Sequence, residues 1–130
     1  MNDAEAATAL ELYFYDNWIE TEVYFNQVPA NPADGDEFVA FWVLPATTIQ
    51  VGLGATPGFR SACVVQVDVN VPAGTGTRRA IELGDQVSEL FLGKQIDGVT
   101  IRDKFVNEIV VEGFYRRILS FNGYYDQTVS

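Results

Sequence analysis

Hydrophobic and polar positions alternate along the middle of the chain. Cys63, Val65, Val67, Val69 and Val71 fall on one face of an extended segment. The other face carries the intervening positions, namely Val64, Gln66, Asp68 and Asn70. A period of two predicts a β-strand with one buried face and one mostly wet face.

A helical pattern follows this strand after a short corner. Pro72 cannot continue a ladder, and Gly74 and Gly76 allow a sharp turn. Apolar or small residues then recur at helical spacing, namely Ala80, Leu83, Gly84, Val87, Leu90 and Phe91. We expect Thr77 to cap this helix and Gly93 to end it. The segment 63–93 therefore predicts one strand and one helix that share a core.

The first third of the chain predicts a second helix and more strands. Asn2 and Glu5 form a capping pattern, and a helix is expected from Asp3 to Ile19. Its apolar stripe contains Ala6, Leu10, Tyr13, Phe14 and Trp18. Residues 21–28 have strand composition, residues 29–35 form a loop, and residues 37–44 form a strand. Both faces of 37–44 become apolar toward its end, which indicates contact with another subunit.

The remaining segments complete an antiparallel arrangement. Residues 45–48 are expected to turn the chain, 49–53 to return as a hairpin, and a flexible tip to precede Phe59. Residues 94–101 surround a turn at Asp97-Gly98. Further strands are expected at 105–112 and 116–125, and residues 126–130 are expected to be frayed. The predicted fold is α+β: an antiparallel-rich β-sheet with an N-terminal helix and a second helix packed on one side, in a single domain of residues 1–130.

Two segments resemble a known family. VPAGTGTRRAIELGDQVSELFLG (residues 71–93) resembles the strand-to-helix signature of the small, lambda-type tail terminator (tail completion) proteins of long-tailed bacteriophages. DGDEFVAFWVLP (residues 34–45) resembles the second-strand signature of the same family. Order and spacing match over about residues 10–126. These motifs mark a fold and its turns rather than a chemistry.

The resemblance implies a virion structural protein. Such a protein forms a ring, in this case a homo-hexamer, on the head-proximal end of the tail tube. There it stops tube polymerisation and presents a surface to the head–tail connector or neck protein. Its partners would be its own copies, the tail tube protein and the connector, and DNA would pass through without specific binding. No cofactor and no enzymatic activity are implied.

Charge is distributed unevenly along the chain. Residues 1–59 contain nine acids and no base, and residues 60–130 contain nine acids and eight bases, so the two parts carry −9 and −1, which sum to −10. Phosphate binding needs clustered Lys and Arg, so this charge opposes a grip on nucleic acid. A solvated acidic surface, a lumen that repels DNA and a surface for a basic partner all fit the pattern.

Composition removes most enzymatic chemistry. The chain has no histidine and one cysteine, which excludes Ser-His and Cys-His nucleophile systems and the usual zinc sites. Cys63 is interpreted as a buried structural residue. Residues 72–79 lack the lysine of a phosphate-binding loop, and Asp34, Asp36 and Glu37 form only a short acidic cluster rather than a calcium loop.

Membrane and secretory roles are also not predicted. No apolar run approaches 18 residues, so no membrane span is expected. The acidic N-terminus lacks a secretory pattern, and a lone cysteine favours intracellular synthesis, in keeping with assembly in the host cytoplasm.

The interface candidates combine apolar residues of the first half with arginines of the second. A ring needs two different complementary faces on each subunit. The candidates are Phe41, Trp42, Ile49, Val51, Leu53, Phe59, Arg78, Arg79, Arg116 and Arg117. The arginines are expected to meet acids of a neighbouring copy. Three alternatives stay open: another head–tail joint protein, an α+β enzyme or small-ligand-binding domain with a pocket between helix and sheet, and a monomeric adaptor.

Overall fold

The computed structural model describes residues 1–25, 37–51, 58–111 and 113–128. Its elements in chain order are α1 (Asp3–Asn17), β1 (Glu22–Phe25), β2 (Phe38–Val51), β3 (Gly58–Pro72), the short 3-10 helix η1 (Ala73–Thr75), α2 (Thr77–Phe91), β4 (Gln95–Ile96), β5 (Val99–Val111) and β6 (Phe114–Thr128). The predicted α+β class is confirmed.

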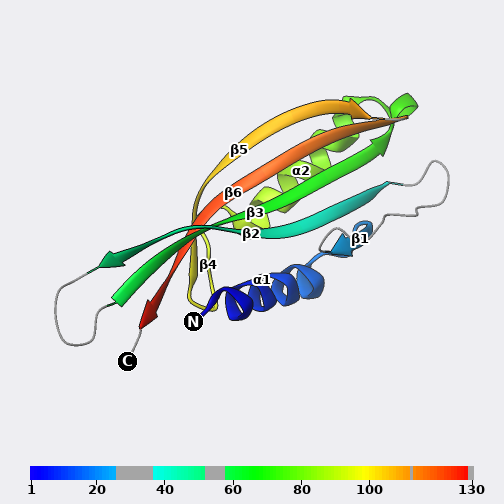
Figure 1. The fold of residues 1–130 in the computed structure, drawn as a ribbon. Coiled ribbons are helices and arrows are strands. Elements are labelled where there is room, and N and C mark those ends of the chain that lie inside the picture. The colour runs from blue at the N-terminus through cyan, green and yellow to red at the C-terminus, as the bar shows by residue number, and fades with distance from the viewer. Residues whose placement is uncertain (26–36, 52–57, 112, 129–130) are drawn as a thin grey trace.

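The described strands form one six-stranded sheet in the order β1-β2-β3-β6-β5-β4. All neighbouring strands are antiparallel except β1 and β2, which are parallel. β2, β3 and β6 continue past the end of β5 as a three-stranded arm, where 48–51 pairs with 58–61 and 58–61 pairs with 125–128 (Figure 1). Both helices pack on the same side of the sheet, where Phe14 of α1 and Phe91 of α2 meet Phe41 of β2, so no described helix covers the other face.

Helix α1 begins as the sequence predicts. The Asn2 side chain accepts a hydrogen bond from the Glu5 backbone N–H at 2.8 Å, and the Glu5 carboxylate accepts one from the Asn2 N–H at 3.1 Å. This capping box satisfies two backbone donors at the helix start. The helix ends at Asn17, two residues before the predicted end, because Trp18 turns to extended backbone.

An aromatic cluster joins both helices to the sheet. The ring of Phe14 lies 5.4 Å from Trp18, 4.8 Å from Phe41 and 5.8 Å from Phe91. Phe91 in α2 continues the cluster to Phe121 in β6, with ring centroids 5.4 Å apart. Offset and tilted arrangements of this kind add to the hydrophobic gain of burial. The helix-facing residues of β3 predicted from the alternation, Cys63 to Val71, are all buried here.

Helix α2 confirms the predicted stripe but not its cap. Gly76 is the N-cap, with φ of +87°, and it provides no side-chain hydrogen bond, so the expectation for Thr77 was wrong. Gly93 has φ of +74° and follows the helix end as expected. Gly84 lies over Arg117 of β6: a Cβ at Gly84 would lie 3.1 Å from Arg117 Nε, so glycine leaves room for that side chain under the helix.

The expected turn at residues 45–48 was wrong. β2 runs through this region, with Pro45 paired to Cys63 and Thr48 paired to Ser61, and only a register shift lies between them. Proline is tolerated because no described strand pairs with β2 on its outer side there, so no ladder hydrogen bond is lost on that side. Ile49 therefore extends β2 rather than returning in a hairpin, and the link to β3 lies in residues 52–57, outside the description.

Two further expectations change. β6 is paired as far as Thr128, so residues 126–128 are not frayed. The helix-free face of β3 is not simply wet, because Asp68 and Asn70 are buried there. The turn at Asp97-Gly98 is confirmed, with φ of +51° and +94°.

Candidate interface surfaces

The short end strands β1 and β4 leave long stretches of the strands next to them, β2 and β5, without an outer strand partner among the described residues. β1 covers β2 only at Phe38–Phe41, which leaves the outer side of 42–49 open. β4 covers β5 only at Val99 and Thr100, which leaves the outer side of 102–110 open. An uncovered edge presents unpaired backbone groups, and proteins normally shield such edges unless they pair with another chain.

The two open edges lie at opposite ends of the sheet. Leu44, Val64, Asn122 and Asp103 form one row across β2, β3, β6 and β5. Toward Phe38, at the start of β2, β1 covers β2 and the outer side of β5 is open. Toward Val51, at the end of β2, the outer side of β2 is open and β4 covers β5. The edges are therefore two different surfaces, staggered along the strands.

Both open edges carry exposed apolar side chains. On β5, Phe105 is 68% exposed and Val110 is 74% exposed, and Ile109 is also exposed. On β2, Leu44 and Ile49 are exposed. Large exposed hydrophobics beside an open strand edge make these two segments candidate contact surfaces.

The helix-free face has a polar centre. Gln66 donates a hydrogen bond to the Asp68 carboxylate at 3.0 Å, and Arg116 Nε donates one to Asn70 Oδ1 at 2.7 Å. Burial raises the pKa of Asp68 above its usual value, against the opposing effects of Gln66 and Arg116. Trp42 is half-buried on the same face, and its indole N–H has no hydrogen-bond partner within the described part of the chain.

A groove of about 400 Å³ lies where this face approaches the arm. The Arg60 guanidinium carbon sits 4.3 Å from the centre of the Tyr124 ring, and that of Arg102 sits 5.8 Å from it. Arg60 also pairs with Asp126 at 2.9 Å. The groove places the cations Arg60 and Arg102 close to the carboxylates of Asp103 and Asp126, and its described lining contains no nucleophile paired with a base.

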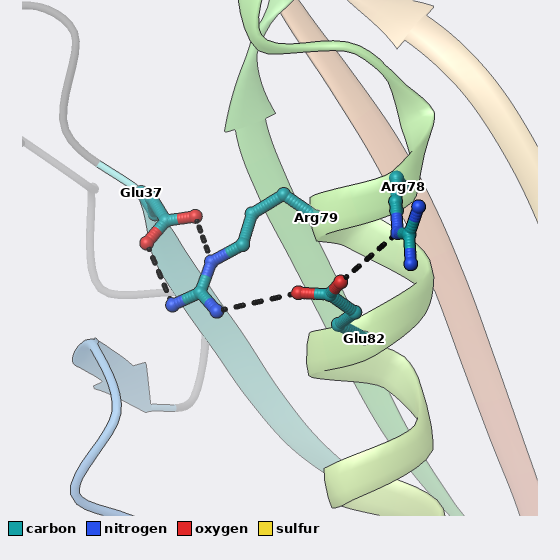
Figure 2. A network of polar contacts seen from close by, with 4 residues as sticks. All are labelled: Glu37, Arg78, Arg79 and Glu82. Atoms are coloured by element: carbon teal, nitrogen blue, oxygen red, sulfur yellow. Dashed lines mark hydrogen bonds and ion pairs between the residues drawn. The ribbon is translucent and has the colours of Figure 1, made fainter.

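The predicted arginines of α2 contact acids of their own chain (Figure 2). Arg79 donates two hydrogen bonds to Glu37, at 2.7 and 3.1 Å, and lies 3.9 Å from Glu82. The hydrogen bonds to Glu37 raise the pKa of the Arg79 guanidinium. Arg78 is different, because its side chain is 93% exposed and its one ion pair among the described residues is with Glu82, at 3.3 Å. Arg79 thus joins the start of α2 to the start of β2, and Arg78 remains available at the surface.

We expect Arg79→Met to lower the free energy of unfolding by about 1 kcal/mol, because it removes the bidentate, partly buried ion pair between Arg79 and Glu37. Arg78→Met is the matched control and should change it by less than about 0.5 kcal/mol, since exposed ion pairs contribute little. Urea unfolding followed by circular dichroism measures both. Equal effects of the two substitutions would contradict the role assigned to Arg79.

The remaining predicted interface residues occupy varied places. Phe41 is fully buried against Phe14, so its ring belongs to the core. Arg117 is paired with Glu108 of the adjacent strand. Phe59 is half-buried on the arm and Val51 ends β2. Leu53 lies outside the described residues, as do Asp34 and Asp36. Trp42 and Ile49 lie on the open stretch of β2.

Cys63 is buried in β3. Burial raises the pKa of its thiol to about 11, with a smaller contribution from Asp3. At pH 8 only about one such thiol in a thousand is ionised. We therefore expect no reaction with a disulfide reagent in the native state and one equivalent after unfolding in urea. Rapid native labelling would show that this part of β3 opens readily.

Other site types find no support in the described residues. Within them, no group of three His, Cys, Asp or Glu residues could hold a metal ion. None of the described helices is long and apolar enough to cross a bilayer.

Comparison with known proteins decides the family. A family model described as phage tail terminator protein matches residues 5–126, nearly the whole chain. The chain belongs to the phage tail terminator family. The resemblance seen in residues 34–45 and 71–93 is thereby confirmed, and this terminator-family chain is a structural component of a phage tail.

Solved structures support the fold of this terminator-family chain. Twenty-one solved chains match it. One of them, 22% identical, aligns with a TM-score of 0.63 over 98% of this chain and 95% of its own length, and it shows the fold alone. No curated protein matches.

Several surface residues of the terminator fold were not identified from sequence. The sequence pattern predicts Phe105, Ile109 and Val110 to be ordinary strand residues, because it does not tell which strand borders the sheet. Arg60, Arg102 and Tyr124 are distant in sequence and meet only through strand register. The one sequence signal was that Asp103 and Asn107, two positions to either side of Phe105, give its strand face a polar character.

Proposed function

We propose that this chain caps the head-proximal end of the phage tail tube as a closed ring, which ends tube polymerisation and joins the tail to the head connector. The observation that carries the proposal is the pair of staggered open edges, on β2 and β5, together with the terminator family. Capping by binding requires no bond to be made or broken, and so no catalytic group.

The edges suit a head-to-tail ring. Strands β2, β3, β6 and β5 alternate in direction, so a neighbour in the same orientation would set its β2 antiparallel to this β5. Because the open stretches are staggered along the strands, the strands would be tilted to the ring axis, which brings the open part of one β2 level with the open part of the next β5. Each such junction leaves one β2 edge and one β5 edge open at the outer ends. Association therefore continues until the ring closes, and the family resemblance implies six subunits.

Charge contributes to the proposal in two ways. The net charge of −10 opposes DNA binding, so the genome would pass through the ring without a specific contact. The acids of residues 1–59 would also attract exposed bases of a neighbour during assembly, and Arg78 is the candidate that remains solvent-exposed.

For this steering, we expect Arg78→Glu to slow ring assembly about three- to tenfold at low salt and to have little effect at 0.5 M salt. Arg79 is not a clean test because its pairing with Glu37 supports the fold. Assembly kinetics by light scattering measure the difference. An unchanged low-salt rate would argue against steering through Arg78.

Native mass spectrometry with negative-stain imaging over a micromolar concentration series tests the ring. A closed ring with a central hole supports the proposal. A monomer at every concentration restricts assembly to the tube end, and tube capping then becomes the deciding assay. A ring that binds the connector but never a tube would instead favour another head–tail joint protein.

A further inference from the structure

Helix α1 has a second apolar stripe on the side that faces away from the sheet. Its inner side packs Ala6, Leu10 and Phe14 into the core. The outer stripe follows the same helical spacing and contains Ala4, Thr8, Leu12 and Tyr15, with Ile19 just beyond the helix end. Leu12 is 57% exposed, Tyr15 69% and Ile19 88%. The solvent-facing side of a surface helix usually carries polar residues, so exposed apolar residues on this side of α1 indicate a contact surface.

Two hollows lie along this stripe. One, of about 430 Å³, lies between the start of α1 and Asp97 and is lined by Ala4, Thr8 and Leu12. The other, of about 370 Å³, lies beside Tyr15 and is lined by Trp18, Val23 and Phe25. Apolar side chains of a partner can enter hollows of this size and become fully desolvated, which is where binding energy concentrates.

Acids border the stripe on both sides. At 100° per residue, Glu11 lies on one side of it and Glu5 and Asp16 lie on the other. No base occurs in residues 1–59, and no described base forms an ion pair with these three acids. The surface is therefore an apolar strip between two negative borders, which selects a partner of opposite charge.

We propose that this outer face of α1, defined by Ala4, Thr8, Leu12, Tyr15 and Ile19, docks a protein other than a further copy of the chain. The partner presents an apolar strip, as on an amphipathic helix, flanked on both sides by Lys or Arg. The proposal does not depend on ring formation, because none of these residues belongs to the open edge of β2 or of β5.

A second copy of the chain does not suit this face, because its Lys and Arg side chains either interact within their own chain or lie far apart in sequence. Arg60, Arg79 and Arg117 form ion pairs within the chain. Lys104 donates to Ser88, and Arg116 donates to Asn70. Of the other three bases, Arg78 pairs with Glu82 at the surface. Arg78, Lys94 and Arg102 lie in three different segments and do not border one apolar strip.

The test uses two synthetic helical peptides of about 15 residues. Both carry the same leucine strip, flanked in one by lysines and in the other by glutamates. Fluorescence anisotropy with the full chain at low salt should show the lysine peptide binding at least about tenfold more tightly, and added salt should weaken it. Equal affinity for both peptides, or no binding of either, would overturn the proposal.

Paired variants locate the site. Leu12→Gln with Tyr15→Gln should weaken lysine-peptide binding at least about tenfold while leaving the urea midpoint unchanged, because both side chains are exposed. Phe105→Lys with Val110→Lys on β5 should leave this binding unchanged. Glu11→Lys with Asp16→Lys should move the preference toward the glutamate peptide, and it spares the capping residue Glu5.

The same variants separate this proposal from ring formation. If Leu12→Gln with Tyr15→Gln abolishes self-association of the chain, the occupant is a second copy and the proposal is wrong. If that variant forms rings normally but loses the peptide, the docking face is distinct from the ring contact, as proposed. If it keeps full peptide affinity, the outer face of α1 is not the site.

Discussion

Replacing Phe14 by alanine should lower the free energy of unfolding by about 3–5 kcal/mol, the largest stability loss that we expect from one substitution. Phe14 is fully buried and contacts aromatic rings from three directions: Trp18, Phe41 and Phe91. Its removal leaves a cavity at the point where α1, α2 and β2 meet. Because domains of this size are stable by only about 5–15 kcal/mol, the loss should be visible in both the thermal and the urea midpoint.

The neighbouring residue supplies the control. Tyr15 follows Phe14 in the same helix but points to solvent, so Tyr15→Ala should change the free energy of unfolding by less than about 0.5 kcal/mol. A loss below about 1 kcal/mol for Phe14→Ala would mean that α1 does not pack on the sheet as described.

The second large effect concerns assembly. Phe105→Lys combined with Val110→Lys should weaken association between copies by about 3 kcal/mol or more, roughly a hundredfold, with little change in folding stability. Two charges on the open edge of β5 lose their solvation if a neighbouring strand pairs there. Sedimentation velocity measures the loss, and Leu12→Gln with Tyr15→Gln serves as a control that removes equally exposed apolar surface elsewhere.

A mixing experiment tests whether the two edges pair with each other. The β5-blocked variant keeps an intact β2 edge, and a β2-blocked variant, Leu44→Lys with Ile49→Lys, keeps an intact β5 edge. Each variant alone should remain monomeric, whereas an equal mixture should form a heterodimer that grows no further. Rings of normal size from either blocked variant would show that the edges are not the contact.

Local patterns predicted much of the fold, because each depends on neighbouring residues only. The alternation from Cys63 to Val71 located β3 and its buried face, and Asn2 with Glu5 located the start of α1. Gly93 and the Asp97-Gly98 turn were identified for the same reason, since their backbone conformations favour these residue types.

The errors arise where tertiary context decides. Pro45 usually signals a turn, but it fits within β2 because the outer side of that strand is open in the described structure. Asp68 and Asn70 have the composition of a wet face, yet Gln66 and Arg116 hydrogen-bond with them in a buried polar centre. Neither outcome is encoded in the spacing of residues along one strand.

The candidate interface was harder to predict than the fold. Whether a strand borders the sheet depends on strand order, so the sequence does not show that Phe105 lies on an open edge. In α1, aromatic and aliphatic residues occur on both sides, so helical spacing alone does not show that Leu10 and Phe14 are buried whereas Leu12 and Tyr15 are exposed. The arginine Arg79 looked available from sequence because its partner Glu37 lies 42 positions away.

The most direct test of tube capping is growth of tail tubes from the purified tail tube protein of the same phage, with and without this chain. Tube lengths and tube ends are measured by negative-stain imaging. We expect the chain at a few molecules per tube to stop growth and to appear as a ring at one end, while the β5-blocked variant does neither. Tubes that keep growing with bare ends, while the wild-type chain stays in solution, would contradict the proposed terminator function.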